Sequence, residues 1–406
     1  MDLRSSRWLL AFVLLWHVLA VFADAWPEVD GKAGASGRDF ASYYYAARVA
    51  DEGGDPYDKV ALGEAARLDG TRATVHPFFY PPPFLLLVSW TTNWPLHQAY
   101  QLWFWIDEAA LIVVAWALVV WSSRLGPAAP VAVLVIIAAL SAIPNNHVMG
   151  QANLIPLAAA MLGVVAVQRD RPLLGGSLVG LACMLKMSPA LIVLWWMLHR
   201  RWTPVVASVV AGIVLSVAAT AVLTPAAQLH FYATVLPAFG SGDYNGLTVP
   251  IGMFGNHSLP NLLHQAFPAE EGLSATARMG SGLLVIGAIG GLASTFVSRG
   301  RDALSEAGQV GATCVAMLLL PVYTYEHHLV WTLPSMVAAV AGIASGRLGA
   351  PWALAVGGAI AVLGYDLASL KNAAEETWQI SGALQEIKTA GIVVIGAANV
   401  SLGRSA

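Results

Sequence analysis

Long runs of apolar residues, separated by short polar connections, repeat along most of this 406-residue chain. About 20 apolar residues, rising 1.5 Å each, cross the hydrocarbon core of a bilayer. The pattern therefore predicts an all-α polytopic membrane protein, a single integral membrane domain over 1–406 with about 12 membrane helices (11–13). The predicted helices lie near 8–23, 98–121, 128–143, 151–167, 172–185, 188–198, 203–223, 279–298, 306–322, 329–345, 350–368 and 387–404.

The basic residues predict which way the chain crosses the membrane. Cytoplasmic connections favour Lys and Arg, and one topology with about twelve crossings places eleven arginines on that side. Few acidic residues share it, namely Asp2, Asp170, Asp302 and Glu306. The arginines are Arg4, Arg7, Arg124, Arg169, Arg171, Arg200, Arg201, Arg299, Arg301, Arg347 and Arg404.

Two long segments, 24–79 and 224–278, face outward in this topology. The first is the most charged part of the protein and predicts two short helices, 40–52 and 57–68. The second is aromatic and rich in Gly and Pro, and we expect it to lie on the membrane surface.

Two assumptions support this topology. The proline-rich segment 80–93 has to enter the outer leaflet and return, since a full crossing there would move several arginines to the other side. The N-terminal run 8–22 follows two arginines as a signal peptide would. Because further spans follow it, we expect it to be retained as a first membrane helix.

Composition excludes several classes of protein. Only 11% of the residues are charged and 57% are hydrophobic, too few polar residues to cover a water-facing surface. The net charge of −3, without a dense basic cluster, gives no reason to expect nucleic acid as a partner. No Walker loop, dinucleotide fingerprint or CxxC motif is present, so a soluble nucleotide donor has no recognisable cradle. An enzyme facing outward would then need a lipid-carried donor.

An ionisable residue interrupts the apolar stretch 172–198 at Lys186, within Lys186-Met187-Ser188-Pro189. Two short helices meeting at this break are expected, with the loose backbone buried or lining a cavity. An ionisable residue inside a membrane segment is costly and usually faces a cavity or a counter-charge. Lys186 is therefore expected to hold a lipid phosphate as a point charge, or to pair with a carboxylate such as Asp107 or Glu108.

Asp39 lies just ahead of the tyrosine-rich helix in the first outer segment. Its carboxylate is placed to accept a proton from a hydroxyl, and Arg38 to tune its pKa. An aspartate before a helix also caps free backbone N–H groups. The two roles are compatible, and the sequence leaves both open.

Polar residues gather at several other predicted span mouths. Tyr80 precedes three prolines that open a helix stiffly, either as a cleft wall or as a structural turn. The amides near His147, including Gln151 and Asn153, would bind sugar hydroxyls or cap helices, because unpartnered amides are expensive there.

Two short histidine motifs lie in predicted outer connections, Asn256-His257-Ser258 and Glu326-His327-His328. Adjacent residues entering a helix diverge by about 100°, so His327 and His328 are poorly arranged to ligate one metal ion. Hydrogen bonds to phosphate or sugar are the expected role, with packing at an interface as the alternative. No motif in the chain requires a metal or cofactor.

Several of these short motifs occur together in the order found in glycosyltransferase family 87, of the GT-C superfamily, which this chain resembles. Each motif is short, but their ordered sum from residue 39 to about 334 is specific. They are Asp39 with the tyrosine-rich helix, Gly54–Tyr57, Phe79–Pro82, Met149–Leu154, Leu174–Gly176, Gly180–Leu181, Leu185–Ala190, Arg200–Trp202, Gly255–Leu259 and Tyr325–Trp331.

The resemblance implies a GT-C fold with long first and fourth extracytoplasmic loops, and an inverting transferase of the cell (plasma) membrane. Its donor would be a polyprenyl-phosphate sugar, most simply mannose, and its acceptor a hydroxyl of a lipid or glycan. Asp39 would be the general base, and His327, or else His328, would serve the donor phosphate or the sugar. Glu326 and His257 depart from the pattern, which has Asp and often Gln there.

A transporter or flippase of a lipid-linked sugar is the rival hypothesis. It would explain the spans, the interrupted helix and the buried Lys186 equally well. It does not explain a long charged outer segment that contains an aspartate, and no matching pair of interrupted helices is found in two halves of the chain.

Overall fold

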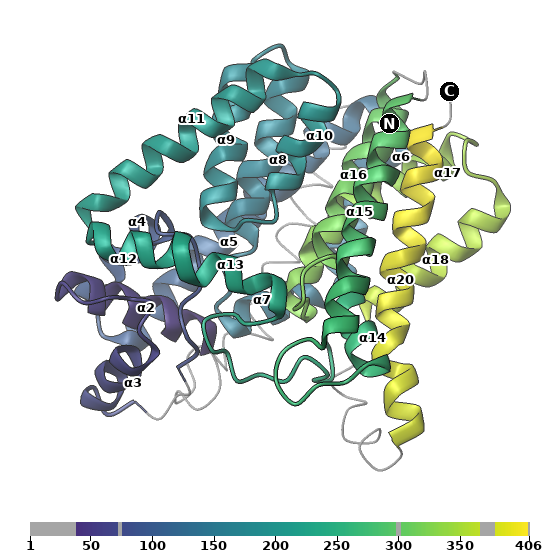
Figure 1. The fold of residues 1–406 in the computed structure, drawn as a ribbon. Helices are drawn as coiled ribbons and strands as arrows, with labels where there is room; N and C mark the ends of the chain where they lie inside the picture. Colours follow the sequence, from purple (N-terminus) through teal and green to yellow (C-terminus); the bar gives the residue numbers. More distant parts are fainter. Residues whose placement is uncertain (1–37, 72–74, 298–301, 366–377, 405–406) are drawn as a thin grey trace.

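The computed structural model describes residues 38–71, 75–297, 302–365 and 378–404. Within these ranges every regular element is a helix, as the apolar pattern predicts (Figure 1). The predicted first span, 8–23, lies outside the described residues, as do the side chains of Arg38, 295–297 and 378–385.

Five helical segments of the described residues are long and apolar enough to cross a membrane. They coincide with predicted spans and fall on α5 (Leu96–Ser122), α11 (Trp202–Ala218), α15 (Ala275–Val297), α17 (Leu333–Ala344) and α20 (Trp378–Arg404). Shorter apolar helices fall on four further predicted spans: α8 (Leu154–Gln168), α9 (Pro172–Leu185), α16 (Ala303–Leu319) and α18 (Ala350–Gly364). The chain is thus an α-helical polytopic membrane protein, and the count of about twelve crossings stays a prediction.

The prediction of one continuous helix over 128–143 is wrong. Two helices replace it, α6 (Ala128–Ala139) and α7 (Ala142–Met149), bent by 52° at the break between them. Pro144 explains the break, because a proline ring clashes with the carbonyl four residues earlier, here that of Leu140. In the first turn of a new helix the same proline is tolerated, so Asn145, Asn146 and His147 lie on α7, whereas Gln151 and Asn153 follow it.

The predicted break at Lys186 is confirmed. α9 ends at Leu185, Lys186 is extended (φ −152°, ψ 130°), and α10 (Ala190–Leu198) begins after Pro189. The proline-rich segment forms only α4 (Phe84–Val88) and η1 (Ser89–Asn93), of 5 residues each. Both are far shorter than the roughly 20 residues of a crossing, consistent with a segment that enters and returns.

The helices form two groups joined by one continuous core. In Figure 1, α8 to α11 lie with α5 in one group, and α15 to α18 lie with α20 in the other. α9 packs closely on α11 because it has glycines at the contact. A Cβ added to Gly180 would lie 2.5 Å from the Ser208 carbonyl oxygen.

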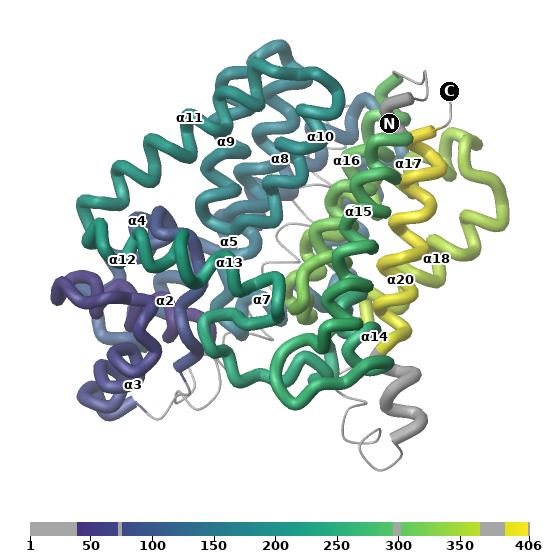
Figure 2. Tube along the Cα trace, in the orientation of Figure 1, coloured from purple at the N-terminus to yellow at the C-terminus, as the bar shows by residue number. Residues whose placement is uncertain are grey.

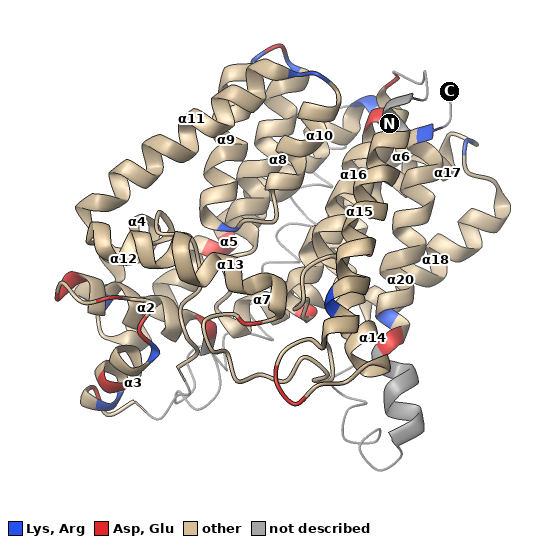
Figure 3. Cartoon of the chain, viewed as in Figure 1, with Lys and Arg blue, Asp and Glu red and all other residues tan. Residues whose placement is uncertain are grey.

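Charged residues are sparse along the middle of the helices and gather toward their ends (Figure 3). Glu306, at the start of α16, accepts from Arg124 (2.8 Å) and from Arg201 (2.9 Å). Asp302 caps the same helix and pairs with Arg347. These contacts bring predicted cytoplasmic connections together at one end of the bundle, as the topology requires.

The two long outer segments pack against each other. The first contains α2 (Arg38–Asp51) and α3 (Lys59–Leu68), close to the predicted bounds. The second contains α12 (Pro225–His230), η4 (Phe231–Val235), α13 (Leu236–Ala238), η5 (Phe239–Ser241) and α14 (Leu259–Ala266). Figure 2 shows these segments at the same end of the molecule.

Side-chain contacts hold the two outer segments together. His230 Nδ1 lies 2.6 Å from Asp55 Oδ2, and Asn245 donates to the carbonyls of Tyr57 (2.8 Å) and Phe78 (2.9 Å). The two loops predicted on one face of the membrane therefore form one structure.

Close packing of α9 on α11 predicts that Gly180→Ala lowers stability, although alanine is about 1 kcal/mol better than glycine within helices. Overpacking of this kind costs roughly 1–3 kcal/mol, which thermal unfolding in detergent would detect. Gly357→Ala on α18 is the matched control, because a Cβ there meets nothing within 4 Å. Equal melting temperatures for the two variants would contradict the packing.

Candidate active site

One cavity of about 940 Å³ lies at the end of the bundle that the outer segments cover. Its walls are largely apolar and come from both helix groups, including Leu191 on α10, Val285 on α15 and Met317 on α16. Eight of the polar residues predicted from the sequence line it: Asp39, Tyr80, Gln151, Lys186, His257, Glu326, His327 and His328. Residues that are far apart in the chain thus meet in one place.

Asp39 lies in the first turn of α2, which begins at Arg38, rather than ahead of the helix. Negative charge is favoured there by the partial positive charge of a helix N-terminus. Burial, then Tyr323 and the Asp39 carboxylate, raise the pKa of Tyr325 above its ordinary value. Asp39 therefore lies within electrostatic reach of the histidine segment across the cavity.

Two tyrosines form a hydroxyl cluster beside Asp39. The hydroxyls of Tyr43 and Tyr80 lie 2.8 Å apart, and each lies 3.2 Å from Gln151 Oε1. Burial raises the pKa of both phenols, and the Asp39 carboxylate adds to the effect. Both remain neutral hydrogen-bond donors throughout the physiological pH range.

Lys186 reaches Asn153, whose Oδ1 accepts from the ammonium. Asn153 Nδ2 in turn donates to Asn146 Oδ1 (3.0 Å) and to the His327 carbonyl (3.2 Å). Asn146 Nδ2 then donates to Asp107 Oδ2 (2.5 Å). In the described part of the chain no carboxylate pairs directly with Lys186, so the predicted direct pair with Asp107 or Glu108 is wrong.

His147 and Asn153 are buried behind the cavity wall. His147 contacts the Ile143 carbonyl through Nδ1 (2.8 Å) and Glu108 through Nε2 (3.2 Å). The side chain of Asn153 makes no cap on α8, so helix capping does not explain it. The amides chiefly hold one another and Lys186.

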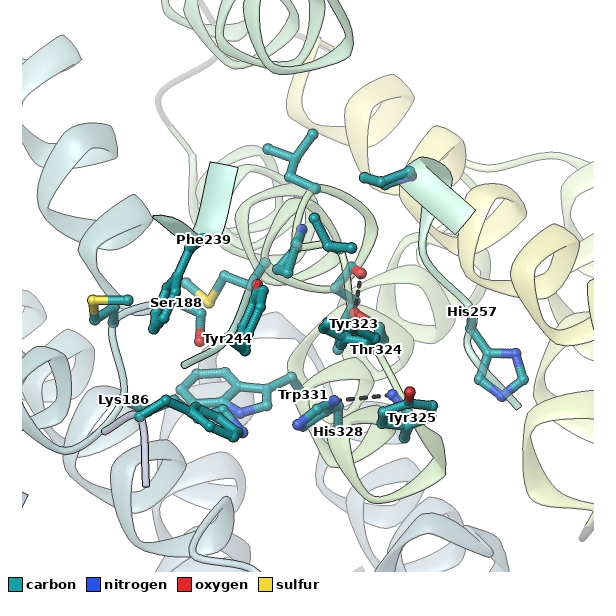
Figure 4. Close-up of a pocket in the computed structure, with 18 of the residues that line it drawn as sticks. Lys186, Ser188, Phe239, Tyr244, His257, Tyr323, Thr324, Tyr325, His328 and Trp331 are labelled. Carbon is teal, nitrogen blue, oxygen red and sulfur yellow. Dashed lines mark hydrogen bonds between the residues drawn. The ribbon is translucent and has the colours of Figure 1, made fainter. Parts of the chain in front are cut away.

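The histidines lie on η6 (Glu326–Thr332), with ring centroids 4.3 Å apart at an angle of 74°. His328 Nδ1 accepts from the Tyr325 backbone N–H (3.0 Å), so its proton is assigned to Nε2. Figure 4 shows Lys186, Trp331, His328 and Tyr325 along one side of the cavity.

Glu326 is compensated by a residue that the sequence did not suggest. Its Oε1 accepts from the ammonium of Lys388 on α20 and from Ser141 Oγ (2.6 Å). Its Oε2 lies 3.5 Å from His257 Nε2. Lys388 is fully buried at the outer end of a predicted span, and the argument applied to Lys186 would have found it. The two departures from the family pattern, Glu326 and His257, thus contact each other.

Asn256 supports the loop behind His257. Its Nδ2 donates to the carbonyls of Ile251 and Val322 (2.9 Å each), and its Oδ1 accepts from the Thr324 backbone N–H (2.9 Å). Both polar atoms of its side chain are thus engaged with backbone groups. The predicted role of Arg38 falls on a side chain outside the described residues.

Comparison with known proteins finds one family and a distant relative. The sequence model of glycosyltransferase family 87 matches residues 78–321. A polyprenol-phosphate-mannose-dependent alpha-(1-2)-phosphatidylinositol pentamannoside mannosyltransferase of Mycolicibacterium smegmatis is 29% identical over 201 residues. That alignment covers 50% of this chain and 45% of the relative, so it spans less than half of the relative's length. Asp39 and η6 lie outside the range matched by the family.

Replacing Lys388 alone is expected to lower the stability of the protein more than replacing both Lys388 and Glu326. Lys388→Met leaves the largely buried Glu326 (side chain 17% exposed) without its cation, at a cost of about 3–5 kcal/mol. Adding Glu326→Gln should restore much of the loss, measured by thermal unfolding in detergent.

The exposed pair of Arg347 and Asp302 provides the control. Arg347→Gln should change stability by less than about 1 kcal/mol. A double variant no more stable than Lys388→Met alone would show that the buried pair does not carry this energy.

Proposed function

This chain belongs to glycosyltransferase family 87, and we propose that it is an inverting glycosyltransferase. It moves a sugar, mannose in the simplest case, from a polyprenyl-phosphate donor to a hydroxyl of a lipid or glycan acceptor. One observation carries the proposal. A single largely apolar cavity collects a carboxylate (Asp39), an ammonium (Lys186) and two histidines.

The apolar walls of the cavity support a lipid-linked donor. A prenyl chain needs a water-poor surface, and residues such as Leu191, Val285 and Met317 provide one. Lys186 is the cation for the donor phosphate, and a polar group fixed within an apolar pocket sets the orientation of a ligand. The relative from Mycolicibacterium smegmatis is itself described as polyprenol-phosphate-mannose-dependent.

Asp39 is the general base of the proposed reaction. Its carboxylate takes the proton from the acceptor hydroxyl while that oxygen forms a bond to the anomeric carbon. The bond from this carbon to the donor phosphate oxygen breaks, and the electron pair leaves on polyprenyl phosphate. The attack comes from the face opposite the phosphate, so the anomeric configuration inverts.

The remaining polar residues stabilise charge and position substrates. Lys186 and the Nε2–H of His328 face the oxygen on which negative charge develops, and His327 lies beside them. A phosphate leaving group needs little acid assistance, which agrees with one critical carboxylate in place of the pair used by glycoside hydrolases. Tyr80 and Gln151, as neutral donors and acceptors, suit sugar hydroxyls.

The active site is proposed to lie on the extracytoplasmic face of the plasma membrane. The ion pairs of Glu306 and Asp302 gather arginine-bearing connections at one end of the helices, and the cavity lies among the outer segments. The positive-inside rule assigns the arginine-rich end to the cytoplasm.

Asp39→Asn should lower turnover at least about 100-fold, because it removes the base while preserving size and hydrogen-bonding shape. Purified wild type and variant in detergent would receive polyprenyl-phosphate mannose and candidate lipid acceptors, with product quantified by mass spectrometry.

Asp51→Asn is the matched control, the same exchange at the far end of α2, outside the cavity. It should retain wild-type turnover. Equal activity in all three proteins would refute Asp39 as the base while keeping the enzyme. No product from the wild type with any donor, together with movement of an unchanged lipid-linked sugar between leaflets, would favour a flippase.

A further inference from the structure

Asp107 is a buried carboxyl group that the proposed mechanism does not use. It lies on α5 with no exposed surface, and its Oδ2 accepts from Asn146 Nδ2. It does not line the cavity. A carboxyl group inside an apolar bundle is costly and is retained where it holds other groups in place.

A chain of hydrogen bonds leads from Asp107 to the cavity. Asn146 Nδ2 donates to the carboxyl, Asn146 Oδ1 accepts from Asn153 Nδ2, and Asn153 Oδ1 accepts from the Lys186 ammonium. Both amides are fully buried. The chain joins α5, α7 and the start of α8 to the break between α9 and α10.

The direction of this chain matters as much as its length. An amide presents a donor on one side and an acceptor on the other, and at the start of the chain Asp107 Oδ2 accepts from Asn146 Nδ2. With an acceptor at Asp107, each amide turns its oxygen toward the cavity, so the chain ends in an acceptor for the ammonium. Reversed amides would turn an N–H₂ group toward Lys186, a donor facing a donor.

Other contacts reinforce the same orientation. Asn146 Nδ2 also donates to the Gln151 carbonyl (3.0 Å), and Asn153 Nδ2 also donates to the His327 carbonyl (3.2 Å). The chain therefore fixes the backbone of two cavity residues as well as the ammonium.

From this geometry we infer that Asp107 is a positioning residue, which holds the Lys186 ammonium in place through Asn146 and Asn153 for contact with an anionic phosphate. The phosphate part of this inference rests on the proposed function. The positional part does not. Asp107 touches no substrate and acts only through the amides.

Glu108 provides a matched control on the same helix. It is 4% exposed, and its Oε1 lies 3.2 Å from His147 Nε2 instead of joining the chain to Lys186. Asp107→Asn and Glu108→Gln thus each replace one buried carboxyl group by an amide at neighbouring positions. Of the two residues, only Asp107 belongs to the hydrogen-bond chain that leads to Lys186.

The first measurement is chemical and independent of catalysis. Acetylation of Lys186 by a small amine-reactive ester at neutral pH is quantified by mass spectrometry against the exposed Lys59. A lysine held as a hydrogen-bonded ammonium reacts slowly, so Asp107→Asn should raise the rate at Lys186 about fivefold or more, and Glu108→Gln less than twofold. Asn146→Ala interrupts the same chain and should reproduce the increase even if Asp107→Asn folds poorly.

The second measurement is a double-mutant cycle on kcat/KM for the donor. Lys186→Met should lose about 100-fold and Asp107→Asn about tenfold, but adding Asp107→Asn to Lys186→Met should cost nothing further. Losses that multiply, or unchanged Lys186 labelling in both chain variants, would overturn the inference. If the wild type makes no product, the proposed function fails, and the labelling rates alone decide the role of Asp107.

Discussion

The ammonium of Lys186 lies where α9 ends and α10 begins, in a protein with little polar surface to surround it. A charge in that position has to find its partners within the protein, and here Asn153 accepts from the ammonium at the end of a hydrogen-bond chain that begins at the Asp107 carboxyl group. The same constraint governs Glu326, held by Lys388, and Glu306, held by two arginines. Each compensation joins helices that are remote in the chain, so the arrangement of charges and the arrangement of helices depend on each other.

The cavity exists because the polar segments of the chain converge at one end of the bundle. α2 brings Asp39, the break after α9 brings Lys186, and η6 brings the histidines. If only the sides of long helices met here, these polar residues would be buried against neighbouring helices and would not reach a cavity. Short helices, breaks and returning segments instead leave their ends around a common space, which is where irregular backbone is tolerated in a membrane protein.

Much of this architecture was predictable from apolar run lengths, because spanning a bilayer imposes a length on every helix. The break at Lys186 was predictable too, since a lysine and a proline close together cannot continue an apolar helix cheaply. The apolar pattern does not reveal the bend before α7, because the apolar run continues up to Pro144 without a charged residue. Run length cannot say on which side of a proline a helix restarts.

The sequence predicts which residues belong to the candidate site better than it predicts which of them contact one another. Asp39, Lys186 and the histidines reach one cavity, as expected of polar residues at span mouths. Which residues face the cavity and which stand behind it depends on helix rotation, so Asn153 and His147 could not be separated from Gln151. Lys388 can be singled out from the sequence as an ionisable residue in a predicted span, but its pairing with Glu326, 62 residues away, cannot, because pairing across that distance is set by packing.

The tie between α20 and η6 has a consequence for biosynthesis. Lys388 lies on the last described helix, whereas the cavity residues named above all precede it in the chain. During synthesis from the N-terminus those residues can enter the membrane and assemble while Glu326 still lacks its cation. The charge of Glu326 is therefore compensated by Lys388 only when α20 docks, and a polypeptide halted before that helix would hold Glu326 without this cation.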